Sequence, residues 1–431
     1  MFTVGSFLLT AVLGLAGYII SKFIWQIYFS RSNGSRIPGP PIINEKEGNL
    51  RELRQAETLS TYIEGLHNKY GPIVLFYMGP QPVVSIGSAE LFQESMQSKL
   101  FDRPEVLFKP PLVEVITASS IQLTNGPEGR RRHALYSHFF NATAKFFPQF
   151  QKCIDEISSS LAGSDGPILL KPIAFDLTLS VMSKCAFAGV FAESELTRLI
   201  SFYDLWSSDI EKKLKGRDID EGTAYPEQIR KIVEDALSKR RRGEVLIWAI
   251  YFLAKQPDIQ DKLAREMRQN LSGSSENWEI VPEDVERLPY LRQVLNETLR
   301  LRSPGPFAAR ISDKSHQLGG FQIPPNMPVM HAIGYVTHHQ AYYEQPQSFD
   351  PEHFSPENVQ KRHPFAFKPF GFAGNRMCPG NRFAVQEASV SLALLISRFH
   401  FRLVGDVTAT PNVGFVTRPN EEIWVTVEPR R

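Results

Sequence analysis

Cysteine and an excess of charge are both scarce in this 431-residue sequence. Only three cysteines are present, Cys153, Cys185 and Cys378. A secreted chain of this length usually carries more, paired in disulfides, so we infer a reducing compartment. The 48 basic and 46 acidic residues leave a net charge of +2. This near balance gives no support for binding nucleic acid through bulk charge, and we expect no nucleic-acid partner.

Charged residues are absent from positions 2–20, which are rich in Leu, Val, Ala, Gly and Phe. About 20 such residues cross a hydrocarbon core of about 30 Å. A cleaved signal peptide is the alternative, but a basic n-region is missing and the apolar run continues past Lys22. Because Lys22, Arg31 and Arg36 lie at or just beyond the end, the positive-inside rule keeps them cytosolic. We expect a membrane anchor over residues 1–30, a Pro/Gly linker over 31–41, and one cytosolic domain over 42–431.

The patterns beyond the linker are mostly helical, and 42% hydrophobic residues suffice for a substantial core. The expected fold class is mainly α with a minor β-sheet. Residues 70–88 read as two strands joined by a Gly-Pro turn. Helices are expected over residues 88–97, 130–144, 149–162, 173–188, 244–255, 259–271, 281–301 and 380–398, and further short strands near 320–323, 329–333 and 423–427.

The most informative stretch is residues 368–384, KPFGFAGNRMCPGNRFA, which contains Cys378. Gly374 and Gly380 let the backbone turn sharply and come close, because neither has a Cβ. Backbone N–H groups in such a turn, and the N-terminus of a helix that follows it, stabilise a thiolate. This arrangement suits a thiolate bound to haem iron, a ligation that favours O–O bond cleavage. The alternative is a buried structural cysteine in a Gly-rich loop.

The stretch resembles the haem-binding loop of the cytochrome P-450 superfamily, with four residues in register: Gly374, Arg376, Cys378 and Gly380. The resemblance implies haem b with Cys378 as the axial ligand and as the catalytic and metal-binding residue. Members usually have a phenylalanine seven residues before the cysteine, where this chain has Gly371. We expect a flanking ring, Phe370 or Phe372, to cover the sulfur instead.

Glu297 and Arg300 stand three residues apart on one face of an expected helix. Taken alone, such a pair is typical of an exposed ion pair on a solvated helix. By resemblance, the two residues form a buried structural network with a basic residue of the segment that contains Pro351 and Phe354. That third member is usually arginine and here is His353, which has a shorter reach and a pH-dependent charge.

Several basic residues are candidates for the haem propionates, because arginine clamps a carboxylate with two hydrogen bonds. By resemblance they are Arg310, after a Pro-rich turn, Arg376 in the cysteine loop, and members of the basic run 130–133, with Arg131 and His133 as the candidates. A tryptophan is common before this run, where the chain has Gly129. Which of these side chains faces inward is left open.

The superfamily stretch for oxygen activation, Ala/Gly-Gly-x-Asp/Glu-Thr, has no match here. Residues 239–244 read KRRRGE instead, and four basic residues are costly to bury above a haem. We infer a deletion near Arg242–Gly243, through a splice isoform or an error in the gene model. The closer resemblance is to animal cytochrome P-450 family 20, carried by residues 45–50, 66–74, 371–374 and 421–427.

The resemblance implies a monooxygenase at the endoplasmic reticulum membrane, single-pass, with its domain in the cytosol. It would oxidise an apolar small molecule with dioxygen and electrons from an NADPH-dependent reductase. One alternative is a membrane-anchored haem protein without turnover, as a sensor, carrier or inactive isoform. Another is a thiolate-haem isomerase or peroxide-using enzyme. A basic docking face for the reductase would comprise Lys262, Arg265, Arg268, Lys368 and Arg382.

Overall fold

A computed structural model describes residues 17–18, 20, 37–42, 44, 46–97, 102–107, 121, 124–186, 243–271, 280–372, 376–413 and 417–430. Most of the expected anchor over residues 1–30 lies outside these ranges, as do the residues 239–242 next to the inferred deletion. Among the described residues, a helix with the length and apolar character needed to cross a bilayer is not found. The anchor therefore stays a prediction.

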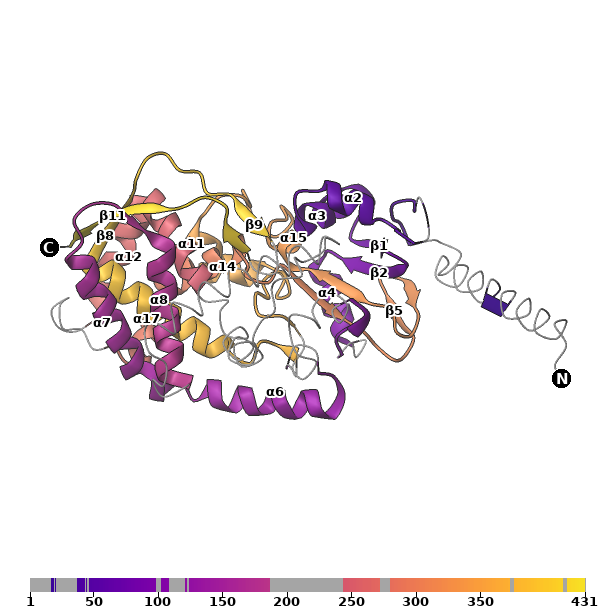
Figure 1. Cartoon of the computed structure of the whole chain (residues 1–431), viewed down its shortest axis with the longest axis horizontal. Coiled ribbons are helices and arrows are strands. Elements are labelled where there is room, and N and C mark those ends of the chain that lie inside the picture. Colours follow the sequence, from indigo (N-terminus) through magenta and orange to yellow (C-terminus); the bar gives the residue numbers. More distant parts are fainter. Residues whose placement is uncertain are drawn as a thin grey trace, which may run out of the picture.

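The described part of the chain is mainly helical, with small sheets, as expected (Figure 1). Its helices are α2 (Leu50–Gln55), α3 (Leu59–Tyr70), α4 (Ala89–Gln97), α6 (Gly126–Asn141), α7 (Phe147–Ala162), α8 (Leu170–Ala186), α11 (Gly243–Lys255), α12 (Pro257–Asn270), α13 (Pro282–Glu286), α14 (Pro289–Leu301), α15 (Ile333–Thr337), α16 (Pro356–Lys361) and α17 (Asn381–Arg398). Short 3₁₀ turns cover η1 (Thr143–Phe146) and η2 (Pro351–Phe354).

A helical half contains the larger core, formed by α7, α8, α11, α12, α14 and α17. Helix α11 is apolar on every side and its residues from Val245 to Ala254 are buried, as an all-round hydrophobic helix must be. Helix α17 packs against α7, α12 and α14. A sheet of β3 (Ile168–Leu169), β11 (Trp424–Pro429) and β8 (Phe399–Leu403) edges this half.

The other half is built on a four-stranded sheet in the order β1 (Ile73–Met78), β2 (Gln81–Ile86), β7 (Val329–Ala332), β4 (Phe307–Arg310). Strands β1 and β2 form the expected hairpin, β2 pairs with β7 in parallel, and β4 pairs with β7 antiparallel. Two-stranded ribbons join β5 (His316–Leu318) to β6 (Phe321–Ile323) and β9 (Pro411–Val413) to β10 (Thr417–Pro419).

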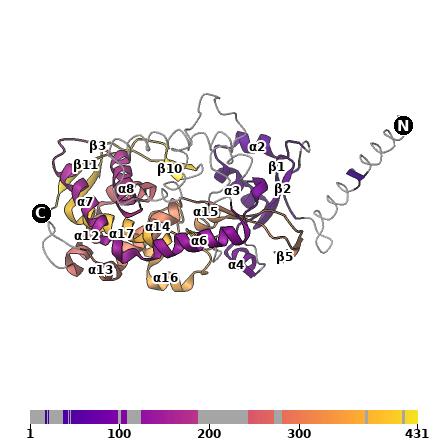
Figure 2. The same cartoon turned by 60° about the horizontal axis from the view of Figure 1, so that its bottom comes forward.

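Helix α6 lies along the molecule between these two halves, at the bottom of Figure 1 and across the front of Figure 2. Its N-terminal end is near the β-sheet half and its C-terminal end leads through η1 into α7. The loop before α17 therefore meets α6 from one side and β4 from the other, as the contacts below show.

Two expected helices have bounds other than those that the sequence pattern suggested. The helix expected over residues 281–301 is two helices, α13 and α14, with a break at Leu288. Pro289 has no N–H and disfavours helical backbone at Leu288, whose φ and ψ are −113° and 68°. The helix expected over 130–144 begins earlier, at Gly126, and its last residues form the separate turn η1.

Candidate functional site

The loop before α17 is closed by backbone hydrogen bonds around Cys378. The N–H of Cys378 donates to the carbonyl oxygen of Phe370 at 3.0 Å, and the N–H of Asn381 donates to the carbonyl of Cys378 at 3.3 Å. Gly371 has a φ of +86°, a conformation that a residue with a Cβ adopts only at a cost. Helix α17 begins at Asn381, so its N-terminal dipole lies three residues after the sulfur-bearing side chain.

Cys378 is half-buried and lines a pocket between this loop and three helices. The surroundings of the thiol are mostly apolar, and their members are Val245 of α11, Leu295 and Leu299 of α14, Pro304, Phe370, and Ala384 and Ala388 of α17. Gly380 lines the same pocket. A pocket of this kind suits a flat apolar group whose metal takes one sulfur ligand.

The two rings considered for covering the sulfur, Phe370 and Phe372, pack in different halves of the molecule. Phe370 lines the pocket with Cys378 and packs on the helical core. Phe372 packs into the sheet half, with its ring centroid 4.7 Å from that of Phe92 and 5.0 Å from that of His331. Of the two rings, Phe370 is therefore the one that shares the pocket with Cys378.

Two buried arginines, Arg376 in the loop and Arg310 in β4, are linked through the backbone of Arg376. Arg376 bonds the carbonyl oxygen of Thr124 at 2.9 Å, the carboxylate of Asp102 at 3.0 Å and the amide oxygen of Asn125 at 2.9 Å. Arg310, at the end of β4, donates to its neighbour Ala309 and to the carbonyl oxygen of Arg376 at 3.3 Å. Burial, followed by repulsion from Arg376, lowers the pKa of Arg310 to about 10, so it stays charged at neutral pH.

Arg310 is 6% exposed, and within the described part of the chain its hydrogen bonds go only to carbonyl oxygens. A buried cation without a carboxylate is costly, and an anion beside it relieves that cost. A propionate supplies such an anion. The thiol, the apolar pocket and this unneutralised guanidinium together fit haem b.

The basic run on α6 points in different directions. Arg131 is exposed and binds Glu128 through two nitrogens, at 2.7 and 2.8 Å, so it already has an acidic partner at the surface. His133 reaches the cysteine loop, with Nε2 2.7 Å from the carbonyl oxygen of Met377. Neither side chain resembles Arg310, a buried cation without an acid.

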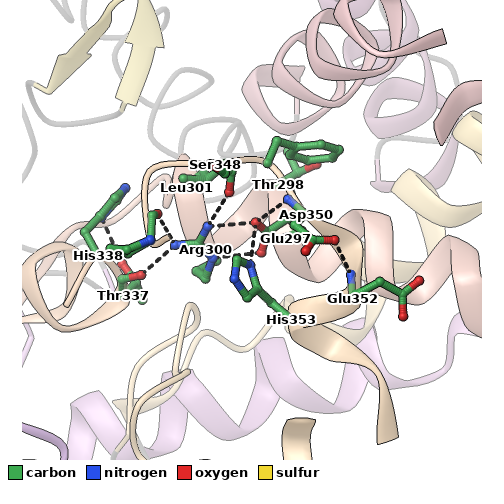
Figure 3. A network of polar contacts seen from close by, with 12 residues as sticks. Glu297, Thr298, Arg300, Leu301, Thr337, His338, Ser348, Asp350, Glu352 and His353 are labelled. Carbon is green, nitrogen blue, oxygen red and sulfur yellow. Dashed lines mark hydrogen bonds and ion pairs between the residues drawn. The ribbon is translucent and has the colours of Figure 1, made fainter. Parts of the chain in front are cut away.

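Glu297, Arg300 and His353 come together as expected, in a network at the junction of α14 with η2 (Figure 3). Arg300 donates two hydrogen bonds of 2.7 Å to Glu297 and reaches the carbonyl oxygens of Thr337, Pro346 and Ser348. The N–H of Asp350 donates to Glu297 Oε1 at 2.9 Å. The network therefore ties α14 to the end of α15 and to the loop that leads into η2, which is a structural role.

Charge on this network is compensated. Burial alone would raise the pKa of Glu297, but hydrogen bonds from Arg300 and His353 bring it below its ordinary value. His353 faces Glu297 at 3.1 Å through Nδ1 and the carbonyl oxygen of Glu344 at 2.6 Å through Nε2. The hydrogen bond to Glu297 raises the pKa of His353. Since both ring nitrogens face acceptors, the imidazolium form satisfies both.

Sequence reasoning missed the partners that hold Arg376. Asp102, Thr124 and Asn125 lie more than 250 residues before it in the chain, and nothing in their local pattern indicates the contact. Gly129 was the available signal. A Cβ built there would stand 2.3 Å from the carbonyl oxygen of Thr124 and 3.2 Å from the guanidinium of Arg376, so the larger residue common at this place has no room.

Comparison with known proteins gives one consistent result. The family model described as Cytochrome P450 matches residues 38–211 and 244–426. Cytochrome P450 20A1 of Rattus norvegicus is 27% identical over 473 aligned positions, which cover 98% of this chain and 98% of that protein. The Homo sapiens protein of the same name is 25% identical with the same coverage. Cytochrome P450 4X1 of Rattus norvegicus is 37% identical over 182 residues, 41% of this chain and 34% of that protein.

Proposed function

Because the chain belongs to the cytochrome P450 family, we propose that it is a haem-thiolate monooxygenase that oxidises an apolar small molecule. Proteins of this family bind haem b through a cysteine thiolate. In this chain the proposed ligand is Cys378, which lines the pocket and is followed directly by α17. The pocket position of Cys378 is the observation that carries the proposal.

The chain's own residues would divide the work of holding the cofactor. Cys378 would bind the iron, and Phe370 and Gly380 would pack beside the sulfur. Arg310 would pair with a propionate, while Arg376 would hold the loop against the start of α6 through Asp102 and Asn125. When bound, haem supplies dioxygen activation, and the thiolate promotes O–O cleavage. We leave Arg131 out of the proposed set because it is engaged by Glu128 at the surface.

Electron supply and location are parts of the same proposal. An NADPH-dependent reductase would deliver electrons, and the N-terminal segment would anchor the chain in the endoplasmic reticulum membrane with its domain in the cytosol. Lys262, Arg265 and Arg268 are exposed on α12 at three-residue steps, a spacing that suits a basic docking face. Lys262 already forms an ion pair with Glu352 at 2.8 Å, so part of the positive charge on that face is neutralised.

The test is the absorbance spectrum of the reduced, carbon-monoxide-treated protein. Full-length chain would be expressed with haem, as wild type, Cys378→Ser and Cys185→Ala. We expect a thiolate-type signal from wild type and from the Cys185 variant, and none from the Cys378 variant. Because Cys185 is a partly buried cysteine on α8, it controls for loss of a thiol elsewhere. A thiolate signal that survives Cys378→Ser would refute the assignment.

A second candidate function is haem binding without turnover. It is favoured by the basic residues 239–242, which replace the expected oxygen-activating stretch, and by the family match, which stops at residue 211 and resumes at 244. The two functions differ in NADPH consumption. A thiolate signal with no reductase-driven consumption across a panel of apolar compounds would favour the haem protein without turnover.

A further inference from the structure

His133 connects the middle of α6 to the loop that carries Cys378. Its Nε2 lies 2.7 Å from the carbonyl oxygen of Met377, the residue directly before the cysteine. The two partners are 244 positions apart in the chain, so this is a tertiary contact between the helix and the loop. The site residues named so far surround the sulfur or the propionate region, whereas His133 bonds the peptide that leads into Cys378.

The bond requires a proton on Nε2 of His133. A carbonyl oxygen can only accept, so Nε2 must donate. Nδ1 lies 3.3 Å from the hydroxyl of Ser137, one helical turn further along α6. That hydroxyl can donate to Nδ1 or accept from it, so Nε2 is free to donate to the loop in either case.

The peptide between Met377 and Cys378 is thus held at both ends. Its carbonyl oxygen accepts from His133, and its N–H donates to the carbonyl oxygen of Phe370 at 3.0 Å. A peptide held at both polar groups resists rotation, so the backbone from which the Cys378 side chain projects is held in place. The side chain of Met377 is 38% exposed and adds little anchoring of its own.

We propose that His133 is a positioning residue for Cys378, acting through the Met377 carbonyl, and not a propionate ligand. The inference deepens the proposed function and rests on it, because it assigns the orientation of the axial thiolate to one histidine of α6. Ser137 has a supporting part, through its contact with Nδ1 of that histidine. Loss of the His133 donor would free the peptide and let the cysteine leave its productive direction.

The experiment follows the thiolate signal over time in haem-loaded, full-length protein. His133→Ala is compared with wild type, with His133→Gln, whose amide N–H can still donate, and with His138→Ala, an exposed histidine of the same helix. For His133→Ala we expect the reduced, carbon-monoxide-bound protein to lose its thiolate signal roughly fivefold faster, the factor for one hydrogen bond of about 1 kcal/mol. His133→Gln should restore most of the wild-type rate, and His138→Ala should match wild type.

The outcomes distinguish a failure of the positioning role of His133 from a failure of the proposed function. If wild type gives no thiolate signal, the proposed function fails. If wild type gives the signal and His133→Ala keeps it at the wild-type rate, the positioning role is refuted. Faster haem loss with an unchanged signal in the haem that remains would also refute it, and would favour a propionate contact. Should His133→Ala not fold, Ser137→Ala takes its place, with loss of signal faster than wild type expected and a wild-type rate contradicting the proposal.

Discussion

Arg300 is the most heavily bonded side chain of the described region, with five hydrogen bonds and no exposed surface. Its partner Glu297 is equally buried. A buried ion pair of this kind stabilises the folded state little against an apolar substitute, but removing one partner leaves a bare charge in the interior. The network therefore makes the junction of α14 and η2 intolerant of single changes.

We expect Arg300→Ala to lower the free energy of unfolding by about 3–5 kcal/mol, because Glu297 would stay buried without its cation. Urea unfolding of the full chain measures this. The matched control is Arg287→Ala, which breaks another i, i+3 pair, with Asp284 at 3.6 Å, whose arginine is 61% exposed. Its expected cost is below about 1 kcal/mol. Equal costs for the two variants would contradict the buried-charge argument.

His353 makes the same network sensitive to pH. Its pKa is raised in the folded state, chiefly by the hydrogen bond to Glu297. A raised pKa means that the stabilisation is complete below the unfolded value of about 6.5 and is lost as pH rises through the folded pKa. Three other groups lie beside the imidazole ring: the Glu344 carbonyl, the Arg300 guanidinium and the Tyr343 ring. Arg362 donates to the backbone carbonyl of His353.

For His353→Gln we expect the loss of stability relative to wild type to be largest near pH 6 and to shrink as pH rises, because glutamine has no proton to lose. The change cannot exceed about 1.4 kcal/mol per pH unit for one proton. Urea unfolding at several pH values from 5.5 to 9 tests it. Glu297, whose pKa is lowered, remains ionised over this range and adds no slope. A constant difference between the two proteins would show that His353 does not titrate in the network.

At the scale of elements, the close approach of α6 to the cysteine loop depends on one glycine. Gly129 is buried in α6, and a Cβ there would stand 2.3 Å from the carbonyl oxygen of Thr124, which accepts from Arg376 at 2.9 Å. Gly129 is held within α6, whereas Thr124 lies before the helix begins, so we expect the clash to be relieved by moving Thr124. Such a shift would loosen Arg376, and with it the loop.

We expect Gly129→Ala to lower both thermal stability and retained haem, although alanine is the better helix former. Gly65→Ala is the matched control, since Gly65 lies inside α3 and its added Cβ would meet no atom within 4 Å. That variant should gain about 0.5–1 kcal/mol. Thermal unfolding and the haem-to-protein absorbance ratio are the measurements. A gain in stability in both variants would disprove the steric argument.

Elements with a strong local signal were predictable from sequence. The hydrophobic run of α11, the Ser88 cap before α4 and the hairpin of β1 and β2 all agree with the structure. Strands β4 and β8 were missed, because runs of four or five residues acquire strand character from their partners β7 and β11. The break before α14 was missed because the amphipathic pattern continues through Pro289 and masks the effect of the proline.

Some residues of the candidate site were likewise predictable from sequence, and others were not. Cys378, Glu297 and Arg300 follow from motifs whose spacing is local, and the structure brings Glu297 and Arg300 together as expected. The choice between Phe370 and Phe372, or between Arg131 and His133, depends on which direction adjacent side chains take. Direction on a helix or loop is decided by tertiary packing, so neighbours with the same chemistry cannot be ranked from sequence.

At the scale of the whole molecule, the cysteine loop is where the two halves meet. Arg376 ties it to the start of α6, Arg310 reaches it from β4, and α17 carries it into the helical core. All of these contacts are made by residues of the described part of the chain, which does not include residues 187–242. The proposed binding of haem by Cys378 and the proposed activation of oxygen involve different stretches of the chain, so we expect them to respond to different changes.

We expect the wild-type chain to show the thiolate signal while forming little product per NADPH consumed, because residues 239–243 read KRRRG where the superfamily carries an acid and a threonine. A variant with the superfamily stretch Ala/Gly-Gly-x-Asp/Glu-Thr inserted ahead of Gly243 should keep that signal and raise product per NADPH several-fold, since those two side chains relay protons. The matched control is the same insertion with its acid and threonine both replaced by alanine, which restores length and spacing alone. Reductase-driven assays on a panel of apolar compounds give the ratio. If the wild-type chain already forms as much product per NADPH as the extended chain, residues 239–243 do not reduce that ratio. The inferred deletion then has no functional consequence.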